Sequence, residues 1–281
     1  MKEDHRGIHI FGNPLHPVSK GFLCIRGKRY AQLHTSPSRL CHPLLKKEGG
    51  WQEVSRPDAL TFLAERLLQI KQKYGPESVV FYKGESLKHQ ETSLYLGHLA
   101  HGFGTPNYIT VGSLCHFAMT LGFKLTCGGM PAPDYTRIKS AIVWGANPAV
   151  SLARSGIALR KAVKNGLKLV VVDPSFTRTA KLADCHLAIT PGADGFLALA
   201  FIKHAVLNQH VHTSLKMGNG WDELSRMVAR MPMDELLRPT GIDVDQFQFA
   251  ASLLFHHLPG WIQTGSGLEL QPGGVQTVRA V

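Results

Sequence analysis

Two apolar runs of strand length enclose one amphipathic segment in the middle of the chain. Residues 141–144 (Ala-Ile-Val-Trp) and 167–172 (Leu-Lys-Leu-Val-Val-Val) are almost continuously apolar, which is typical of strands buried on both faces of a parallel sheet. Residues 151–165 between them have the period of a helix. The pattern predicts a βαβ unit, with a Gly-Ala-Asn-Pro turn at 145–148 after the first strand and Asp173 after the second.

Similar patterns predict helices and strands on both sides of this unit. Ser55, with Asp58 three positions later, begins an amphipathic helix that Gly75 ends. Asp194 is expected to cap the helix that follows it. Further helices are expected at 90–103, 113–125, 194–207 and through most of 221–255, and further strands at 78–82, 107–110, 186–190 and 261–264. The alternation of strands and helices predicts an α/β protein with a parallel sheet.

The composition is that of a folded protein with material for about two domains. Of 281 residues, 44% are hydrophobic and 18% are charged, and no apolar run approaches the roughly 20 residues of a membrane helix. The N-terminal residues lead into no signal segment, so the sequence carries no export address. Lys and Arg outnumber Asp and Glu by 31 to 20, which favours an anionic partner. On charge alone, nucleic acid and a phosphate-rich cofactor are equal candidates, but no basic run or RNA-binding signature is present.

Five cysteines, at positions 24, 41, 115, 127 and 185, include no close C-x-x-C pair. An odd, widely spread set does not indicate a disulfide framework. Most of these residues, Cys127 and Cys185 among them, are therefore expected to be small core residues.

The turn at 145–148 and Asp173 should lie together, because parallel strands end at the same edge of a sheet. Ligands bind at that edge, where helix N-termini offer free N–H groups to phosphates. Small and polar residues in both loops indicate a nucleotide-bearing cofactor.

Eight short motifs resemble, in order along the chain, those of the molybdopterin oxidoreductases of the dimethyl-sulfoxide-reductase superfamily. They are Gly12-Asn13-Pro14 to Cys24-Ile25-Arg26-Gly27, Ser38-Arg39-Leu40, residues 51–59, Cys115-His116, and residues 144–148, 172–174, 191–194 and 265–267. The resemblance is strongest to the thiosulfate/polysulfide reductase and formate dehydrogenase branches. It implies a Rossmann-like parallel-sheet domain that is incomplete at both ends. Residues 1–50 would be a remnant of an iron–sulfur region, and 51–281 a truncated catalytic region that binds the dinucleotide.

The resemblance implies a molybdenum or tungsten ion held by two molybdopterin guanine dinucleotides. Asp173 would accept hydrogen bonds from ribose or guanine, and Asp194 would read the guanine N–H edge. Taken without the family, Gly145 and Pro148 only make a turn, and Asp173 only caps one. The matching cofactor-binding positions are Gly145, Asn147, Pro148, Asp173, Ser175, Thr177, Gly192, Asp194, Gly265 and Gly267.

Three residues match the family's catalytic positions. Cys115 falls where the family places its protein ligand to molybdenum, and a soft thiolate suits that metal. His116 resembles the histidine that assists proton movement in formate dehydrogenases. Arg26 matches a basic residue between the cluster and the pterin. Taken without the family, Cys115 is more often an inert core thiol, and His116 a surface histidine or one whose hydrogen bonds are satisfied.

Cys24 matches the last of four cysteines that bind a [4Fe–4S] cluster in the family. The other three are absent from the 23 residues before it, so a cluster in this chain is in doubt.

The resemblance implies two-electron redox chemistry on a small substrate, with a sulfur compound such as thiosulfate or polysulfide as the first expectation. Formate oxidation is one alternative, and an inactive truncated fragment is another. The implied partners are an iron–sulfur electron-transfer subunit and, as an open alternative, a membrane-anchor subunit, but no nucleic acid. The compartment is unknown, because intact relatives are cytoplasmic or exported to the periplasm.

Overall fold

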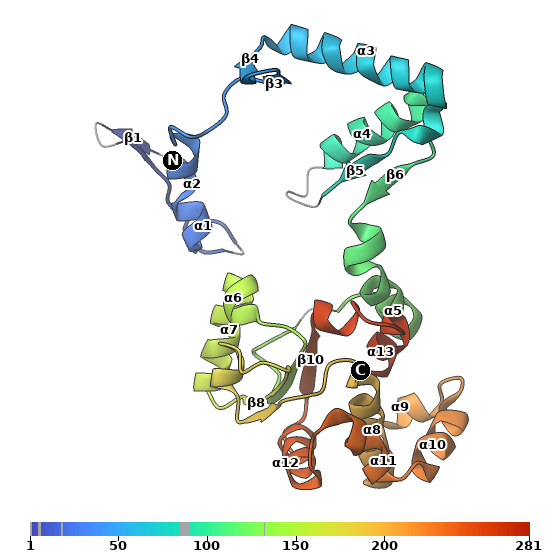
Figure 1. Ribbon diagram of the computed structural model, residues 1–281. Helices are drawn as coiled ribbons and strands as arrows, with labels where there is room; N and C mark the ends of the chain where they lie inside the picture. Colours follow the sequence, from blue (N-terminus) through green and yellow to red (C-terminus); the bar gives the residue numbers. More distant parts are fainter. Residues whose placement is uncertain (1, 5–6, 18, 85–89, 132) are drawn as a thin grey trace. The chain divides into compact units, whose positions relative to one another are not determined.

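The computed structural model describes residues 2–4, 7–17, 19–84, 90–131 and 133–281. Its contacts divide the chain into two compact units, Met1–Val111 and Gly112–Val281 (Figure 1). This boundary after Val111 does not test the functional division at residue 50, which stays a prediction. Among the described residues, no helix has both the length and the apolar character needed to cross a membrane.

The first unit consists of short elements and two longer helices. Its elements are β1 (Lys2–Asp4), β2 (Gly7–His9), α1 (Ile25–Lys28), α2 (Tyr30–His34), β3 (Leu44–Lys47), β4 (Gly50–Glu53), α3 (Arg56–Tyr74), η1 (Pro76–Ser78), β5 (Phe81–Lys83), α4 (Gln90–Phe103) and β6 (Tyr108–Thr110). The pairs β1–β2 and β3–β4 are antiparallel, whereas β5 and β6 are parallel and connected through α4. The strand expected at 78–82 is β5, which begins three positions later and ends one position later; Ser78 belongs to η1.

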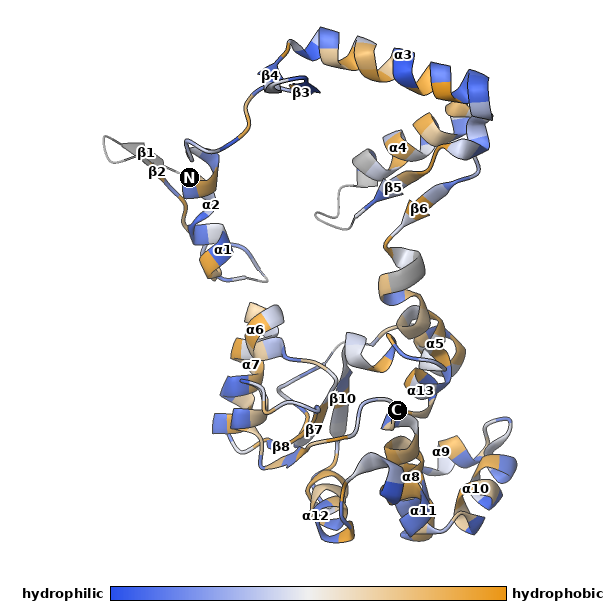
Figure 2. Cartoon of the chain, viewed as in Figure 1, coloured by the Kyte–Doolittle hydropathy of each residue, from blue (hydrophilic) through white to orange (hydrophobic). Residues whose placement is uncertain are grey.

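The start and end of α3 confirm the prediction from the sequence. The Ser55 Oγ accepts the Asp58 N–H at 3.2 Å and donates to the Asp58 Oδ2 at 2.6 Å. Gly75 ends the helix at a φ of +82°, a backbone conformation that favours glycine. Apolar and polar residues alternate along the helix, as Figure 2 shows.

The second unit contains the predicted βαβ segment. Its elements are η2 (Gly112–His116), α5 (Phe117–Cys127), β7 (Ser140–Trp144), α6 (Pro148–Ser151), α7 (Ala153–Lys164), β8 (Lys168–Val172), η3 (Ala180–Leu182), β9 (Cys185–Leu187), α8 (Asp194–Leu207), α9 (Thr213–Lys216), α10 (Trp221–Arg230), α11 (Met233–Leu237), η4 (Arg238–Thr240), α12 (Val244–Phe255), β10 (Gly260–Thr264), η5 (Ser266–Leu268) and α13 (Gly274–Ala280). Four strands form one parallel sheet in the order β10-β7-β8-β9. The protein therefore has a mixed α/β fold with a parallel sheet.

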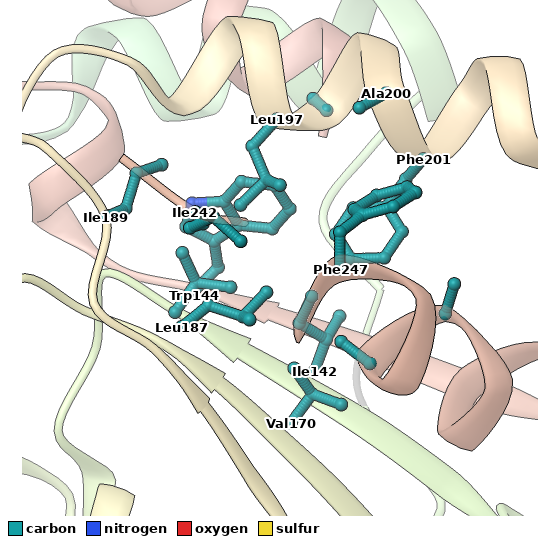
Figure 3. Packing of buried hydrophobic residues seen from close by; sticks show 14 of the residues in the cluster. Ile142, Trp144, Val170, Leu187, Ile189, Leu197, Ala200, Phe201, Ile242 and Phe247 are labelled. Atoms are coloured by element: carbon teal, nitrogen blue, oxygen red, sulfur yellow. The ribbon is translucent and has the colours of Figure 1, made fainter. Parts of the chain in front are cut away.

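Both faces of this sheet are covered, which explains why its strands are almost continuously apolar. Ile142 and Trp144 of β7 face the helices α8 and α12, where they pack with Phe201 and Phe247 (Figure 3). The alternate residues of the same strands pack against α7, whose Leu159 is buried on that side. The edge where β7, β8 and β10 end is thus a rigid platform for the loops that follow.

The helix expected at 151–165 corresponds to α7, and a separate short helix, α6, precedes it. The chain leaves helical geometry at Leu152 (φ −126°, ψ 72°), between α6 and α7. A Cβ on Gly156 would lie 2.5 Å from the carbonyl oxygen of Pro148, so α7 packs directly against the backbone of α6. In one straight helix, Gly156 could not lie this close to the backbone of Pro148, and the bend at Leu152 allows it.

Two further predictions were wrong in detail. Ala193, not Asp194, is the N-cap of α8, because the Asp194 carboxylate is turned into the protein. Of the cysteines expected in the core, Cys185 is buried within β9, but Cys127 is exposed at the end of α5. The thiols of Cys41 and Cys115 are also exposed, and Cys24 is half-buried. These four lie in loops or at helix ends rather than on the faces that form the core.

Candidate functional site

Two glycine-containing loops meet at the carboxyl end of the sheet, one after β7 and the other after β10. Gly145 has a φ of +59°, and its N–H donates to the Val172 carbonyl at 2.9 Å. The N–H of Gly265 donates to the Trp144 carbonyl at 2.9 Å, and that of Gly267 to the Gly145 carbonyl at 3.4 Å. A Cβ on Gly265 would lie only 2.2 Å from the Gly145 oxygen. The two backbones are too close for any side chain between them.

Asn147 and Pro148 form the turn that follows Gly145. Asn147 is the N-cap of α6, and Pro148 is its buried first residue. The Asn147 Oδ1 accepts the hydroxyl proton of Thr179 at 2.7 Å. The same Thr179 oxygen accepts the Ala149 N–H at 3.2 Å, and this threonine is fully buried. A side chain from the loop after β8 therefore fixes the turn after β7.

Asp173 lies at the end of β8, as the sequence predicts, and organises its own loop. Its Oδ1 accepts the Ser175 N–H at 2.9 Å, and its carbonyl accepts from the Nε2 of His186 at 2.9 Å. The Thr177 Oγ1 accepts the Ala180 N–H at 3.1 Å at the start of η3. Asp173 and Thr177 are half-buried and Ser175 is exposed. This loop presents a carboxylate and two hydroxyl groups at the carboxyl edge.

Asp194 lies below the loops and is only 6% exposed. Its Oδ1 accepts the indole N–H of Trp144 at 2.7 Å, and its Oδ2 accepts an amide N–H of Gln271 at 3.2 Å. Gly192, at a φ of +88°, lies beside Gln271. Because protein donors engage both oxygens, Asp194 supports the loops, and Asp173 is the more accessible carboxylate. The predicted reading of guanine by Asp194 stays a prediction.

Cys115 and His116 end a π-helical turn, η2, directly before α5. The helix expected from residue 113 thus has a different geometry over its first turn. Such π-helical turns are rare and occur often at functional sites. Both side chains are exposed, and the His116 Nδ1 lies 3.6 Å from a carboxylate oxygen of the buried Glu269. An exposed thiol beside a histidine is able to meet a ligand from solvent.

Cys24 and Arg26 belong to the first unit. The backbone N–H of Gly27, and to a lesser extent that of Arg26, forms a hydrogen bond that holds the pKa of the Cys24 thiol below its ordinary value. Arg26 is exposed on α1. Within the part of the chain that the structure describes, no three His, Cys, Asp or Glu side chains are grouped so as to hold a metal ion.

The structure thus brings Gly145 into contact with Gly265 and Gly267, which lie 120 and 122 positions later in the chain. No sequence pattern indicates Thr179, Gln271 or Glu269, although their side chains bind residues far away along the chain. Each is a single polar residue without a local motif, and its partners lie far away along the chain. A pattern among neighbouring residues cannot identify them, because their role depends on which distant positions are in contact in the folded chain.

These loops and this sheet belong to a known family: the chain is a member of the molybdopterin oxidoreductases, whose family pattern it matches over residues 39–281. Members of that family carry a molybdopterin cofactor. The chain is 28% identical over 271 residues to the assimilatory nitrate reductase catalytic subunit of Bacillus subtilis, covering 94% of this chain and 38% of that protein. It therefore spans less than half the length of this relative.

Two other proteins are similar to the chain. The thiosulfate reductase molybdopterin-containing subunit PhsA of Salmonella typhimurium is 28% identical over 257 residues, which cover 84% of this chain and 33% of that subunit. The structure of acetylene hydratase from Pelobacter acetylenicus matches with a TM-score of 0.77 and 24% identity, over 92% of this chain and 36% of that protein. At this identity the structural match shows the fold.

Proposed function

We propose that the chain is the N-terminal portion of a molybdenum or tungsten oxidoreductase, and that its sheet edge binds a molybdopterin guanine dinucleotide. The observation that carries this proposal is the contact between the Gly145 and Gly265–Gly267 loops. Because this contact is made without side chains, main chain alone lies at the carboxyl edge of the sheet, where the turn after a parallel strand binds pyrophosphate in Rossmann-type folds. The domain of residues 51–281 would then be Rossmann-like, with its ligand at the carboxyl edge of the sheet.

The residues around the glycines carry groups that can bind the ribose and the guanine of the dinucleotide. Asp173 presents a carboxylate at the strand end, and carboxylates accept hydrogen bonds from ribose hydroxyls and from the guanine N–H edge. Ser175 and Thr177 supply hydroxyl groups on the same loop. Asn147 and Pro148 would shape the phosphate-binding turn. Gly192 and Asp194 would support this turn from the loop before α8.

Cys115 would be the protein ligand to the metal. Its exposed thiol lies in a π-helical turn next to a helix N-terminus, which favours a negative ligand atom. When bound, the cofactor would supply two-electron redox chemistry at the metal. His116 would hold a proton beside that site, because its exposed imidazole directly follows the thiol.

An iron–sulfur cluster does not fit the residues of this chain. A [4Fe–4S] cluster needs four thiolates, and the first unit contains only Cys24 and Cys41. No step through a cluster is therefore assigned, and Arg26 is a candidate only in an intact enzyme. Electron transfer to an iron–sulfur subunit, with or without a membrane anchor, would belong to that intact enzyme.

A small sulfur compound, such as thiosulfate or polysulfide, is the proposed substrate. The similarity to the thiosulfate reductase subunit supports it, while the similarity to a nitrate reductase favours nitrate as a second candidate. Formate oxidation stays a third candidate because of the Cys115-His116 pair. Viologen-linked turnover of the four compounds by the enzyme that contains this chain separates them.

Analysis of metal and pterin tests the proposal on this chain. The chain is purified from cells supplied with molybdate, and its molybdenum, tungsten and fluorescent pterin are measured. We expect two molybdopterins for each metal ion, and an X-ray absorption spectrum that shows a protein thiolate in addition to the pterin sulfurs. Cys115→Ala should lose one sulfur neighbour, whereas Cys127→Ala, which removes an equally exposed thiol at the other end of α5, should not. Absence of both metal and pterin would support an inactive fragment instead.

A further inference from the structure

Glu269 is a buried carboxylate that reaches the segment of the candidate metal ligand from a distant part of the chain. Its Oε2 accepts the backbone N–H of Met119 at 3.1 Å, across 150 positions of sequence. Its Oε1 lies 3.6 Å from the Nδ1 of His116. The Glu269 side chain is 3% exposed, against 51% for His116. A carboxylate this deeply buried needs such partners, since burial without them is costly.

The contact with Met119 supplies what the start of α5 lacks. The N-cap of this helix is His116, whose side chain makes no capping hydrogen bond. The first N–H groups of a helix have no partner within the helix, and Met119 occupies the third helical position. Glu269 satisfies that group from outside the helix. Its negative charge also lies at the end of the helix that favours an anion.

The position of Glu269 joins this helix to the glycine loop. Glu269 directly follows η5, and its N–H donates to the Ser266 carbonyl at 3.2 Å. Two residues later, Gln271 donates to the buried Asp194. A Cβ on Gly274 would lie 2.4 Å from the Glu269 carbonyl oxygen, so α13 packs closely against the same turn. The turn from residue 265 to 271 is therefore held on several sides.

We propose that Glu269 is a positioning residue that fixes the His116 ring and the first turn of α5. Through it, the loop that contacts Gly145 also sets the geometry of the Cys115-His116 segment. The importance of this geometry for catalysis rests on the proposed function. The positioning itself is a property of the chain and is measurable without cofactor.

Two substitutions of Glu269 separate its two contacts. Glu269→Gln keeps an oxygen that can accept the Met119 N–H but removes the charge beside His116, whereas Glu269→Ala removes both. Glu235→Ala is the control, because Glu235 is an exposed carboxylate on α11. In the full chain labelled with ¹⁵N, at one fixed pH, NMR measures amide hydrogen exchange at Met119 and the imidazole signals of His116.

In Glu269→Ala we expect exchange at Met119 about tenfold faster than in wild type, as the loss of one hydrogen bond requires, together with shifted His116 ring signals. In Glu269→Gln the His116 signals should shift while Met119 exchange stays within about threefold of wild type. Glu235→Ala should change neither.

Unchanged Met119 exchange in Glu269→Ala, or unmoved His116 signals in both variants, would overturn the proposal. If Glu269→Ala does not fold by circular dichroism, Glu269→Gln decides it through the His116 signals. These readouts need no metal. A chain without molybdenum would therefore count against the proposed function alone, and unmoved signals would count against the positioning role alone.

Discussion

Replacement of Gly265 by alanine tests the close approach of the two glycine loops. The backbone of Gly265 is extended (φ −136°, ψ 179°), so an alanine can adopt it without strain. The added Cβ, however, would lie 2.2 Å from the Gly145 oxygen, 2.6 Å from the Ala146 Cβ and 2.8 Å from the Ala146 Cα. The first distance is roughly 1.2 Å inside an ordinary contact, and the opposing atoms are mainly backbone, which cannot turn aside.

The strands of the sheet hold both loops, so the cost of this overlap is not relieved locally. Overpacking of a folded interior typically costs about 1–3 kcal/mol, and a clash between backbones should lie at the upper end, about 3 kcal/mol. Part of that cost is the hydrogen bond from Gly265 to the Trp144 carbonyl, which a loop displacement would lengthen.

Urea unfolding of the full chain measures this cost. The control is Gly129→Ala, because a Cβ on Gly129 meets nothing within 4 Å and its φ is not positive. Gly129→Ala should leave the free energy of unfolding within about 0.5 kcal/mol of wild type or raise it slightly. If Gly265→Ala unfolds at the same urea concentration as this control, the two loops are not in close contact.

Three further predictions concern the supports of the site and of the fold around it. Trp144→Phe leaves the buried Asp194 oxygen without its indole donor, so it should lower the free energy of unfolding by about 2–4 kcal/mol in urea; a loss below about 0.5 kcal/mol would contradict the hydrogen bond. Thr179→Val keeps the side-chain shape but removes the hydroxyl group that donates to the Asn147 Oδ1, so it should lower the free energy of unfolding by about 1–2 kcal/mol. Unchanged stability together with unchanged Asn147 side-chain amide signals in NMR would argue against this hydrogen bond. Burial lowers the pKa of His204 below its ordinary value of 6.5, and the charges of two neighbouring histidines lower it further. The folded state therefore binds fewer protons than the unfolded chain below about pH 6.5, and stability falls as the pH drops from 7.5 to 5. His204→Phe should lose less stability than wild type over this range in thermal melts, and an equal loss would exclude His204 as a cause.

Features that depend on neighbouring residues could be predicted from the sequence. The parallel strands were predicted because burial on both faces makes each of them continuously apolar. The start of α3 was predicted because Ser55 and Asp58 are three positions apart, and the position of Asp173 because it directly follows a strand. Each of these signals lies within a few residues of the feature that it predicts.

Features that depend on packing between distant segments could not be predicted. The bend at Leu152 accompanies the contact of Gly156 with the α6 backbone, and the inward turn of Asp194 accompanies its hydrogen bond to the indole of Trp144, fifty positions away. Glu269 has partners 150 positions away. A resemblance in motifs locates the candidate ligands along the chain, but the residues that hold them in place are visible only in the fold.

Binding of guanosine diphosphate to the full chain tests whether the carboxyl edge of the sheet binds a guanine dinucleotide. This probe contains the guanine, ribose and pyrophosphate that the carboxyl edge of the sheet is proposed to hold, and adenosine diphosphate is its matched control. In ¹⁵N NMR titrations, we expect saturable shifts of the amide signals of Gly145, Asp173, Ser175 and Gly265. Guanosine diphosphate should act at about tenfold lower concentration than adenosine diphosphate, because a polar site discriminates by hydrogen bonds to the base. Shifts that miss these four residues, or equal titrations by the two nucleotides, would show that this edge is not a guanine-dinucleotide site.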